Sequence, residues 1–205
     1  MTIKRGEEWG TPFTAPSVVT HLGSDADIAT MEAGETMIVT GGDLYETLGC
    51  PAIAAPGSTC TLVSVDALQC EVFLPDGTVV IQRVASCIEI GFFRPRLGRQ
   101  HRYVCVSNAG LVKGRNLLPR AHPNDGVMDV LEVASSMTIR NRLVANKKAE
   151  TGTHIPHPNI TTARGTMFEF ENLGESEDLQ LDHTKIPSWV KIRVSVLPDY
   201  WNIVV

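Results

Sequence analysis

Long apolar stretches are missing from this sequence, in which no run approaches the ~20 residues that a membrane-spanning helix needs. The first residues, MTIKRGEEWG, contain no apolar segment of the kind found in a secretion signal. No run of Lys and Arg is present either, and the net charge is −5, which argues against a nucleic-acid partner. The sequence therefore predicts a cytoplasmic protein without a transmembrane segment.

Cysteines are few, and their number is odd. Cys50, Cys60, Cys70, Cys87 and Cys105 are scattered along the chain, without the arrangement of a disulfide framework or a zinc site. Cys70, Cys87 and Cys105 sit in apolar runs. We therefore expect buried free thiols in a reducing compartment.

The residues that are present indicate a turn-rich, mostly β protein. The chain has 17 Gly and 12 Pro, and 43% of its 205 residues are hydrophobic while 20% are charged. This composition is enough for one substantial core, or for two small layers that share one.

Patterning divides the chain into three parts. Residues 1–16 are polar and interrupted by prolines, which predicts an irregular arm. Residues 17–52 have the pattern strand, helix, strand, helix, a small α/β unit. Residues 53–205 contain many short strands and a strong hairpin turn at 75–78. We predict an α+β, mostly β fold, a β-sandwich or twisted mixed sheet preceded by a truncated α/β segment.

Three helices are expected. Ser24 or Asp25 could cap the first, and Asp43 could cap the second, because Ser and Asp accept hydrogen bonds from free N–H groups at helix starts. Residues 135–148 form the third, since Met137, Ile139, Leu143 and Val144 recur at helical spacing and basic residues lie near its end.

Residues 118–130, LPRAHPNDGVMDV, carry the most informative motif. An Asn-Asp-Gly turn leads into an apolar strand and places the carboxylate of Asp125 at the mouth of that strand. Hard cations prefer oxygen ligands, so the Asp125 side chain and the main-chain carbonyls of His122 and Val127 form a candidate Mg²⁺ or Ca²⁺ site. The alternative is a plain turn with Asp and Gly in their usual places.

This segment resembles the Asp-Asp-Gly-Leu-Leu-Asp signature in the second domain of the diacylglycerol kinase and sphingosine kinase superfamily, to which NAD kinase-like proteins are related. From about Asp43 to Val205 the order of landmarks is similar to that domain. The landmarks are the Leu-Gly-x-Pro turn, Val65-Asp66-Ala67, the Asn108 loop, the Asp125 turn, the His154 loop, the Asp182 turn and Leu197-Pro198-Asp199. The resemblance implies a β-sandwich, phosphoryl transfer from ATP to a lipid, and a chiefly structural Mg²⁺.

Two loops resemble phosphate-binding loops of the relatives, and both depart from the family pattern. In the loop that begins at Thr40, Gly42 and Glu46 stand where the relatives have Asn and Arg. Where the relatives have Gly-Gly-Asp-Gly-Thr, this chain has residues 23–27, GSDAD, in which Asp25 falls on the catalytic Asp. Side chains in place of the glycines hinder a phosphate, and Asp27 repels it, so ATP is not an expected ligand. The alternative for both loops is a helix cap or a strand-turn-helix corner. The candidate phosphate-binding residues are Gly23, Ser24, Gly41, Gly42 and Asp43.

The relatives also carry Asp-Gly-Glu near their C-terminus, where this chain has Asp182-His183-Thr184. Asp182 is thus a second catalytic candidate by resemblance. Thr184 replaces the Glu that is thought to activate the lipid hydroxyl, and a neutral hydroxyl is a poor general base. The alternative is a solvated turn.

Two further segments contain candidate binding groups. Lys113, Arg115 and Arg120 make the loop after Asn108 the most basic short segment, a candidate site for an acidic headgroup, with ordinary solvation as the alternative. Residues 152–158, GTHIPHP, contain two histidines, but their prolines favour a stiff structural loop over a metal site.

Three functions remain open. The first, which we favour, is a lipid kinase-like protein without kinase activity that binds a lipid, a small acidic molecule or a protein. The reason is that only about forty residues precede the Gly41-Gly42 turn, too few for the nucleotide-binding domain of the relatives. The second is an active ATP- and Mg²⁺-dependent kinase, with Asp25 as base or metal partner and a separate chain supplying the nucleotide-binding domain. The third is a homodimer subunit that acts through its sheet edges.

Overall fold

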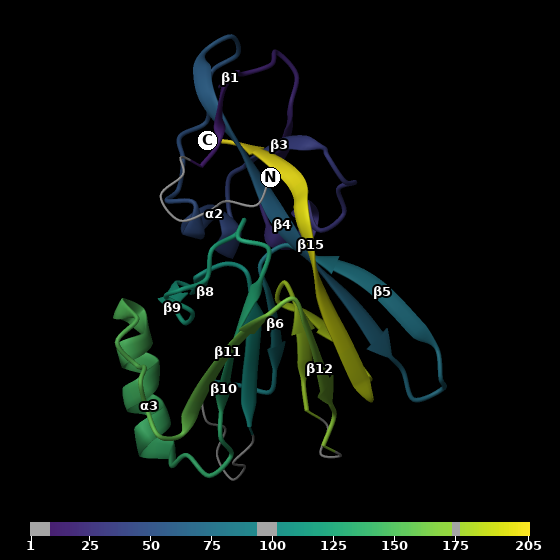
Figure 1. Cartoon of the computed structure of the whole chain (residues 1–205), viewed down its shortest axis with the longest axis vertical. Helices are drawn as coiled ribbons and strands as arrows, with labels where there is room; N and C mark the ends of the chain where they lie inside the picture. The colour runs from purple at the N-terminus through teal and green to yellow at the C-terminus, as the bar shows by residue number, and fades with distance from the viewer. Residues whose placement is uncertain (1–8, 94–101, 174–176) are drawn as a thin grey trace.

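The computed structural model describes residues 9–93, 102–173 and 177–205, which form two main sheets (Figure 1). The larger sheet contains, in order, β1 (Thr11–Thr14), β4 (Thr59–Phe73), β15 (Lys191–Val204), β3 (Thr36–Val39) and β2 (Thr20–Leu22), with β5 (Val79–Val84) beside β4 and β12 (Met167–Glu171) beside β15.

The smaller sheet contains, in order, β11 (Ile160–Gly165), β10 (Met128–Val133), β7 (Tyr103–Ser107), β6 (Cys87–Ile90), β13 (Leu179–Leu181) and β14 (Thr184–Ile186). A small hairpin joins β8 (Leu111–Val112) to β9 (Arg115–Asn116). The helices are α1 (Asp25–Ile28), α2 (Asp43–Thr47), α3 (Ile139–Lys148) and the 3₁₀ turn η1 (Ala149–Thr151).

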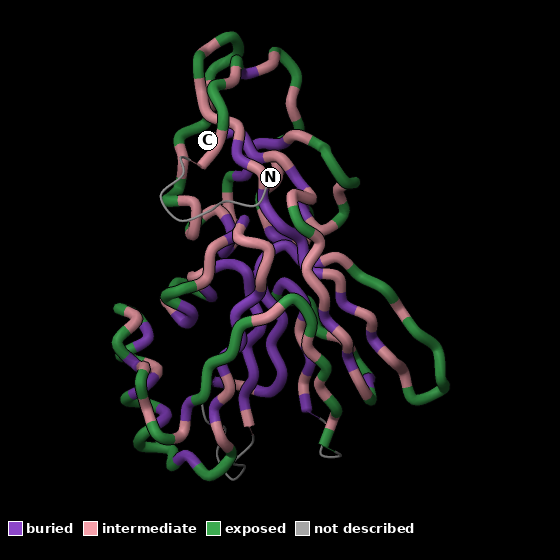
Figure 2. The backbone as a smooth tube through the Cα atoms, in the orientation of Figure 1, coloured by how far each residue is buried: buried purple, intermediate pink, exposed green. Residues whose placement is uncertain are grey.

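The main core lies between the larger sheet and the smaller sheet. Leu68 and Val72 of β4 and Ile192 of β15 belong to the same buried cluster as Ile88 of β6 and Val104 of β7. Much of the tube in the lower half of the molecule has the colour of buried residues (Figure 2). The α+β, mostly β fold with a β-sandwich is therefore confirmed.

The two longest strands join the small α/β part to the sandwich. β4 has 15 residues and β15 has 14, and both run from the upper part of the molecule into the lower part (Figure 1). Their upper halves pair with β1 and β3, and a second buried cluster there contains Met37, Leu44, Val63 and Trp201. The larger sheet is thus continuous across residue 52, where the sequence pattern changes.

The C-terminal segment does not turn back at the Leu197-Pro198-Asp199 landmark, as a final hairpin there would require. Residues 191–196 and 201–204 fall in one strand, β15, which pairs with β4 on both sides of an irregularity between Leu197 and Trp201. Asp199 has a φ of 51° at this point. Proline cannot donate a ladder hydrogen bond, so Pro198 produces a bulge in the strand rather than a turn that reverses it.

Part of the N-terminal arm is ordered by pairing. Residues 11–14, expected to be irregular, form β1 at the edge of the larger sheet, opposite residues 59–62 of β4. Pro12 is compatible with a strand because β1 is an edge strand with only one partner. Just before β1, the indole N–H of Trp9 donates to the carbonyl of Ser64 at 3.2 Å. Residues 1–8 of the arm lie outside the described residues.

Helix α3 buries a different face from the one its apolar residues form. Thr138 caps the helix, and its side chain accepts the N–H of Asn141 at 3.3 Å. Ile139, Leu143 and Val144 are 41%, 54% and 50% exposed. The buried residues are instead Arg142, Ala145 and, directly after the helix, Ala149. Arg142 tolerates burial because its guanidinium donates to the main-chain carbonyls of Met137 and Ala134.

We expect Leu143→Ala to change the free energy of unfolding by no more than about 0.5 kcal/mol, because the side chain is mostly solvated. Ala145→Leu is the matched change on the buried face and should cost about 1–3 kcal/mol by overpacking. Urea unfolding of both variants measures the difference. A larger loss of stability in Leu143→Ala than in Ala145→Leu would show that the apolar face of α3 is buried in the folded protein.

Candidate functional site

The corner between β2 and α1 contains the first pair of candidate phosphate-site residues. Ser24 caps α1, as predicted, and its hydroxyl accepts the N–H of Asp27 at 3.2 Å. The buried carboxylate of Asp25 turns towards α2, where it accepts the N–H groups of Asp43 at 2.7 Å and Leu44 at 3.2 Å. Asp43 is therefore the first residue of α2 rather than its cap, since Asp25 caps this helix from another segment.

The Gly41-Gly42 turn makes this approach geometrically feasible. A Cβ atom on Gly42 would lie 2.5 Å from Oδ1 of Asp25, and a Cβ atom on Gly41 would lie 2.5 Å from the carbonyl oxygen of Gly23. Gly42 also has a φ of 99°, a conformation that favours glycine. The glycines that the sequence suggested for a phosphate thus accommodate an internal carboxylate.

A polar cluster surrounds Asp43 where α2 meets the smaller sheet. One carboxylate oxygen of Asp43 accepts the main-chain N–H of Lys113 at 2.8 Å, and the other lies 2.8 Å from Nε2 of His183. Nδ1 of His183 lies 3.5 Å from Oε2 of Glu89. The ammonium of Lys113 pairs with Glu89, whose other oxygen accepts the hydroxyl of Tyr103 at 2.9 Å.

The electrostatics of this cluster favour a charged imidazole. Hydrogen bonds to Asp43 and Glu89 raise the pKa of His183 to about 9. Burial acts to raise the pKa of Glu89, but hydrogen bonds from His183 and Lys113 prevail and lower it. Burial and the charge of Asp182 raise the pKa of Asp25 to about 6. A protonated His183 has no free lone pair for the proton of a substrate hydroxyl, so this charge state disfavours a general-base role.

Asp182 is buried, and main-chain donors surround it. Its carboxylate accepts the N–H groups of Ala85, Ser86 and Cys87 at 2.7, 2.9 and 3.1 Å, and the hydroxyl of Ser86 at 2.8 Å. Burial raises the pKa of Asp182 in spite of these donors. The carboxylate joins the turn between β13 and β14 to the residues between β5 and β6.

The Asp125 turn is held by two other side chains. Asp125 accepts the N–H of Val127 at 3.3 Å through Oδ1, and its other oxygen pairs with the guanidinium of Arg164. Nε of Arg164 also donates to Asp129 at 3.1 Å. The neighbouring Gly126 donates its N–H to Asp66 at 2.8 Å.

This arrangement suits a guanidinium better than a divalent cation. A Mg²⁺ ligated by Asp125 and the carbonyls of His122 and Val127 would have to displace Arg164, because the cation and the guanidinium would share one carboxylate. The residues present therefore do not fit the structural Mg²⁺ that the family resemblance implies.

The three basic residues of the predicted headgroup site do not converge. Lys113 belongs to the His183 cluster, and Arg115 donates to the main-chain carbonyl of Lys113 at 3.2 Å. Arg120 lines a separate pocket together with Arg164. The histidines of the 152–158 loop also make separate contacts, since Nε2 of His154 lies 3.1 Å from the carbonyl oxygen of Leu117 and His157 accepts the N–H of Asn159.

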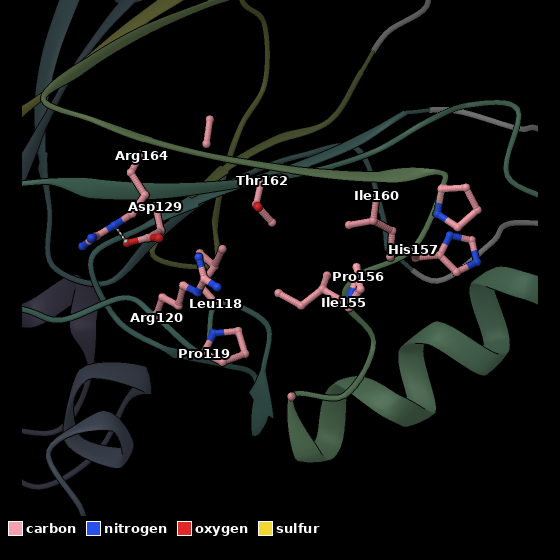
Figure 3. Close-up of a pocket in the computed structure, with 13 residues that line it drawn as sticks. Leu118, Pro119, Arg120, Asp129, Ile155, Pro156, His157, Ile160, Thr162 and Arg164 are labelled. Atoms are coloured by element: carbon pink, nitrogen blue, oxygen red, sulfur yellow. Dashed lines mark hydrogen bonds and ion pairs between the residues drawn. The ribbon is translucent and has the colours of Figure 1, made fainter.

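The pocket that contains Arg120 has a volume of about 960 Å³ and lies beside β10, β11 and the loop after η1. Figure 3 shows Arg120, Arg164 and Asp129 at one end of it and Ile155, Pro156 and Ile160 at the other. The pocket therefore offers two guanidinium groups and an apolar wall to one ligand. Its lining residues are Leu118, Pro119, Arg120, Asp129, Gly152, Ile155, Pro156, His157, Pro158, Ile160, Thr162, Ala163 and Arg164.

Sequence reasoning did not identify Arg164. The only signal in the sequence is the alternation of β11, which places Ile160, Thr162 and Arg164 on the same face of the strand. That alternation does not show which residues face a pocket, because the opposite wall comes from residues 118–120 and 152–158.

Comparison with known proteins identifies a family whose sequence pattern and fold this chain shares. The family described as YegS C-terminal NAD kinase beta sandwich-like domain matches residues 96–204. No curated protein sequence matches the chain. None of the helices among the described residues is long and apolar enough to cross a membrane.

Solved structures with a similar fold include two from Bacillus anthracis str. Sterne. One, named a "putative diacylglycerol kinase", has a TM-score of 0.63 and 13% identity over 89% of this chain and 76% of its own. Another, named a diacylglycerol kinase, has a TM-score of 0.56 and 15% identity over 83% of this chain and 68% of its own. At these identities the similarity establishes the fold.

Proposed function

Because the chain belongs to the family of the YegS C-terminal NAD kinase beta sandwich-like domain, we propose that it binds a small acidic lipid without phosphorylating it. The observation that carries this proposal is the pocket beside β11, where Arg120 and Arg164 line one end of a partly apolar cavity. The neighbours in fold are named for diacylglycerol, so a glycerolipid with an anionic headgroup is the ligand class.

The dimensions and charge of the pocket suit such a ligand. Its volume of about 960 Å³ lies at the upper end of ordinary small-molecule sites. Arginine forms bidentate hydrogen bonds with phosphate, and Arg120 would supply them here. Arg164 would add a weaker contact through its remaining N–H groups, because its Nε and one terminal nitrogen are paired with Asp129 and Asp125. Ile155 and Ile160 would cover the first part of an acyl chain, while the exposed mouth would leave its remainder accessible.

The corner between α1 and α2 supports the absence of phosphoryl transfer. Phosphoryl transfer depends on donors that hold the phosphates and on neutralisation of their charge. The N–H groups of Asp43 and Leu44 are occupied by Asp25. The carboxylates of Asp25, Asp43 and Asp182 lie close enough to influence one another, and they would repel a triphosphate.

Isothermal titration calorimetry with dihexanoyl phosphatidic acid tests the binding site. We expect saturable binding, and Arg120→Gln should weaken it by at least about tenfold, or about 1.4 kcal/mol, because one guanidinium contact with the phosphate is lost. Arg140→Gln is the matched control, since Arg140 lies on the exposed side of α3. Equal affinity in the wild type and Arg120→Gln would place the lipid elsewhere.

The headgroup and the nucleotide are tested separately. Dihexanoyl glycerol, which lacks the phosphate, should bind more weakly than the acid, and Arg120→Gln should not change its affinity. ATP with Mg²⁺ at millimolar concentration should give no saturable heat, and dihexanoyl glycerol should gain no phosphate from radiolabelled ATP. Label transfer by the purified protein would overturn the non-catalytic part of the proposal.

A further inference from the structure

Three chemically different side chains meet where α2 packs on the smaller sheet. They are Asp43 of α2, Cys87 of β6 and His183 of the β13–β14 turn, and one ligand atom from each lies within 4.8 Å of the others. Oδ2 of Asp43 lies 2.8 Å from Nε2 of His183 and 3.8 Å from Sγ of Cys87. Among the described residues, this is the group of His, Cys, Asp and Glu with the spacing of metal ligands.

Sulfur, imidazole nitrogen and carboxylate oxygen together form a ligand set typical of zinc. Tetrahedral bonds of the usual Zn–S, Zn–N and Zn–O lengths separate two ligand atoms by roughly 3.3–3.7 Å. The 2.8 and 3.8 Å separations around Asp43 lie on either side of that range. We propose that Asp43, Cys87 and His183 bind Zn²⁺ with three protein ligands and an open fourth position.

The second nitrogen of His183 has the partner that a metal-binding histidine requires. Histidines that ligate metals usually donate the other ring N–H to a carboxylate, which fixes the orientation of the ring. Nδ1 of His183 lies 3.5 Å from Oε2 of Glu89, while Nε2 points to Asp43. Glu89 is itself held by Tyr103 and Lys113, so it would act as the positioning residue of the site.

The surrounding structure already orients the ligands. The second oxygen of Asp43 accepts the N–H of Lys113, which leaves Oδ2 directed at Cys87 and His183. Asp182 anchors the turn that carries His183. Cys87 is 1% exposed, whereas one third of the His183 side chain is exposed, so an ion and its bound water would enter from the His183 side.

Cobalt provides the direct test, because Co²⁺ replaces Zn²⁺ and reports its ligands by absorption. The metal-free wild type should bind one equivalent of Co²⁺, with tetrahedral ligand-field bands and a thiolate-to-cobalt charge-transfer band, and Zn²⁺ should abolish both. Cys87→Ala should lose the charge-transfer band, and His183→Gln should lower Zn²⁺ affinity at least about 100-fold. Glu89→Gln should lower it about 10–100-fold with the charge-transfer band retained.

Cys70→Ala is the matched control, since Cys70 is also a buried thiol but lies in the main sandwich core. It should keep the wild-type cobalt spectrum. Zn²⁺ should also raise the melting temperature of the wild type and Cys70→Ala but not that of Cys87→Ala. The proposed site is refuted if the wild-type cobalt complex has no charge-transfer band. It is also refuted if that band persists unchanged in Cys87→Ala, even if another variant fails to fold.

Discussion

Asp182→Ala is expected to destabilise the protein by about 3–5 kcal/mol, because it removes the acceptor for buried donors from Ala85, Ser86 and Cys87. A loss of this size should lower the melting temperature by roughly 10 °C or more. Differential scanning calorimetry and urea unfolding measure the effect. The result distinguishes an anchor of the β13–β14 turn from a catalytic residue, the role that the family resemblance suggested for Asp182.

Two milder variants provide the controls for Asp182. Asp182→Asn keeps one carbonyl acceptor and should lose less stability than the alanine variant. Ser86→Ala removes only the hydroxyl that donates to Asp182 at 2.8 Å and should cost about 1 kcal/mol. If Asp182→Ala melted like the wild type but no longer bound its ligand, Asp182 would have a direct role in binding.

The stability of the protein should depend on the ionisation of Asp66. This fully buried carboxylate accepts the N–H groups of Gly126 at 2.8 Å and Asp199 at 2.9 Å, and it connects the Asp125 turn to the bulge of β15. Burial raises its pKa to about 6 from an ordinary value of 3.8, although both N–H groups oppose the shift.

The direction of the pH effect follows from this shift. Between about pH 4 and about pH 6 the folded state holds a proton on Asp66 that the unfolded state has released, so the free energy of unfolding falls as the pH rises. From about pH 4.5 to about pH 7.5 the contribution of Asp66 should decrease by about 2 kcal/mol. Asp25, whose pKa is also raised to about 6, acts in the same direction.

Asp66→Asn isolates this contribution, because asparagine does not titrate. Between about pH 4.5 and about pH 7.5, the wild type should lose about 2 kcal/mol more stability than the variant in urea unfolding experiments. Asp27→Asn is the control, since Asp27 lies exposed on α1. Glu89 has a lowered pKa, so its contribution to the free energy of unfolding is lost at acidic pH. This loss is the same in both proteins and cancels in the comparison. Parallel profiles for the wild type and Asp66→Asn would contradict a raised pKa.

Local features could be predicted because they depend on contacts between residues close in the sequence. Ser24 caps α1 through the N–H of Asp27, and Asp76 fixes the predicted hairpin turn by accepting the N–H of Thr78 at 2.9 Å. Cys70, Cys87 and Cys105 are buried free thiols, as their apolar surroundings predicted. The order of short motifs also indicated the family.

The roles of the candidate site residues depend on partners distant in the sequence. Asp25 caps a helix that begins 18 residues later, and Asp182 accepts donors 95 to 97 residues away. The scattered cysteine positions likewise contain no sign that Cys87 would meet Asp43 and His183. No periodicity or turn rule predicts such contacts.

By itself, the sequence determined the mostly β composition, the strand, helix, strand, helix order of residues 17–52 and the departure of the GSDAD loop from a glycine-rich pattern, since each is a property of neighbouring residues. Only the tertiary structure decided that Arg164 would join Arg120 at a pocket, that α3 would expose its apolar face and that Asp43 would face His183. The reason is physical. Ion pairs and pockets depend on distances between side chains, which arise only when separate strands pack together.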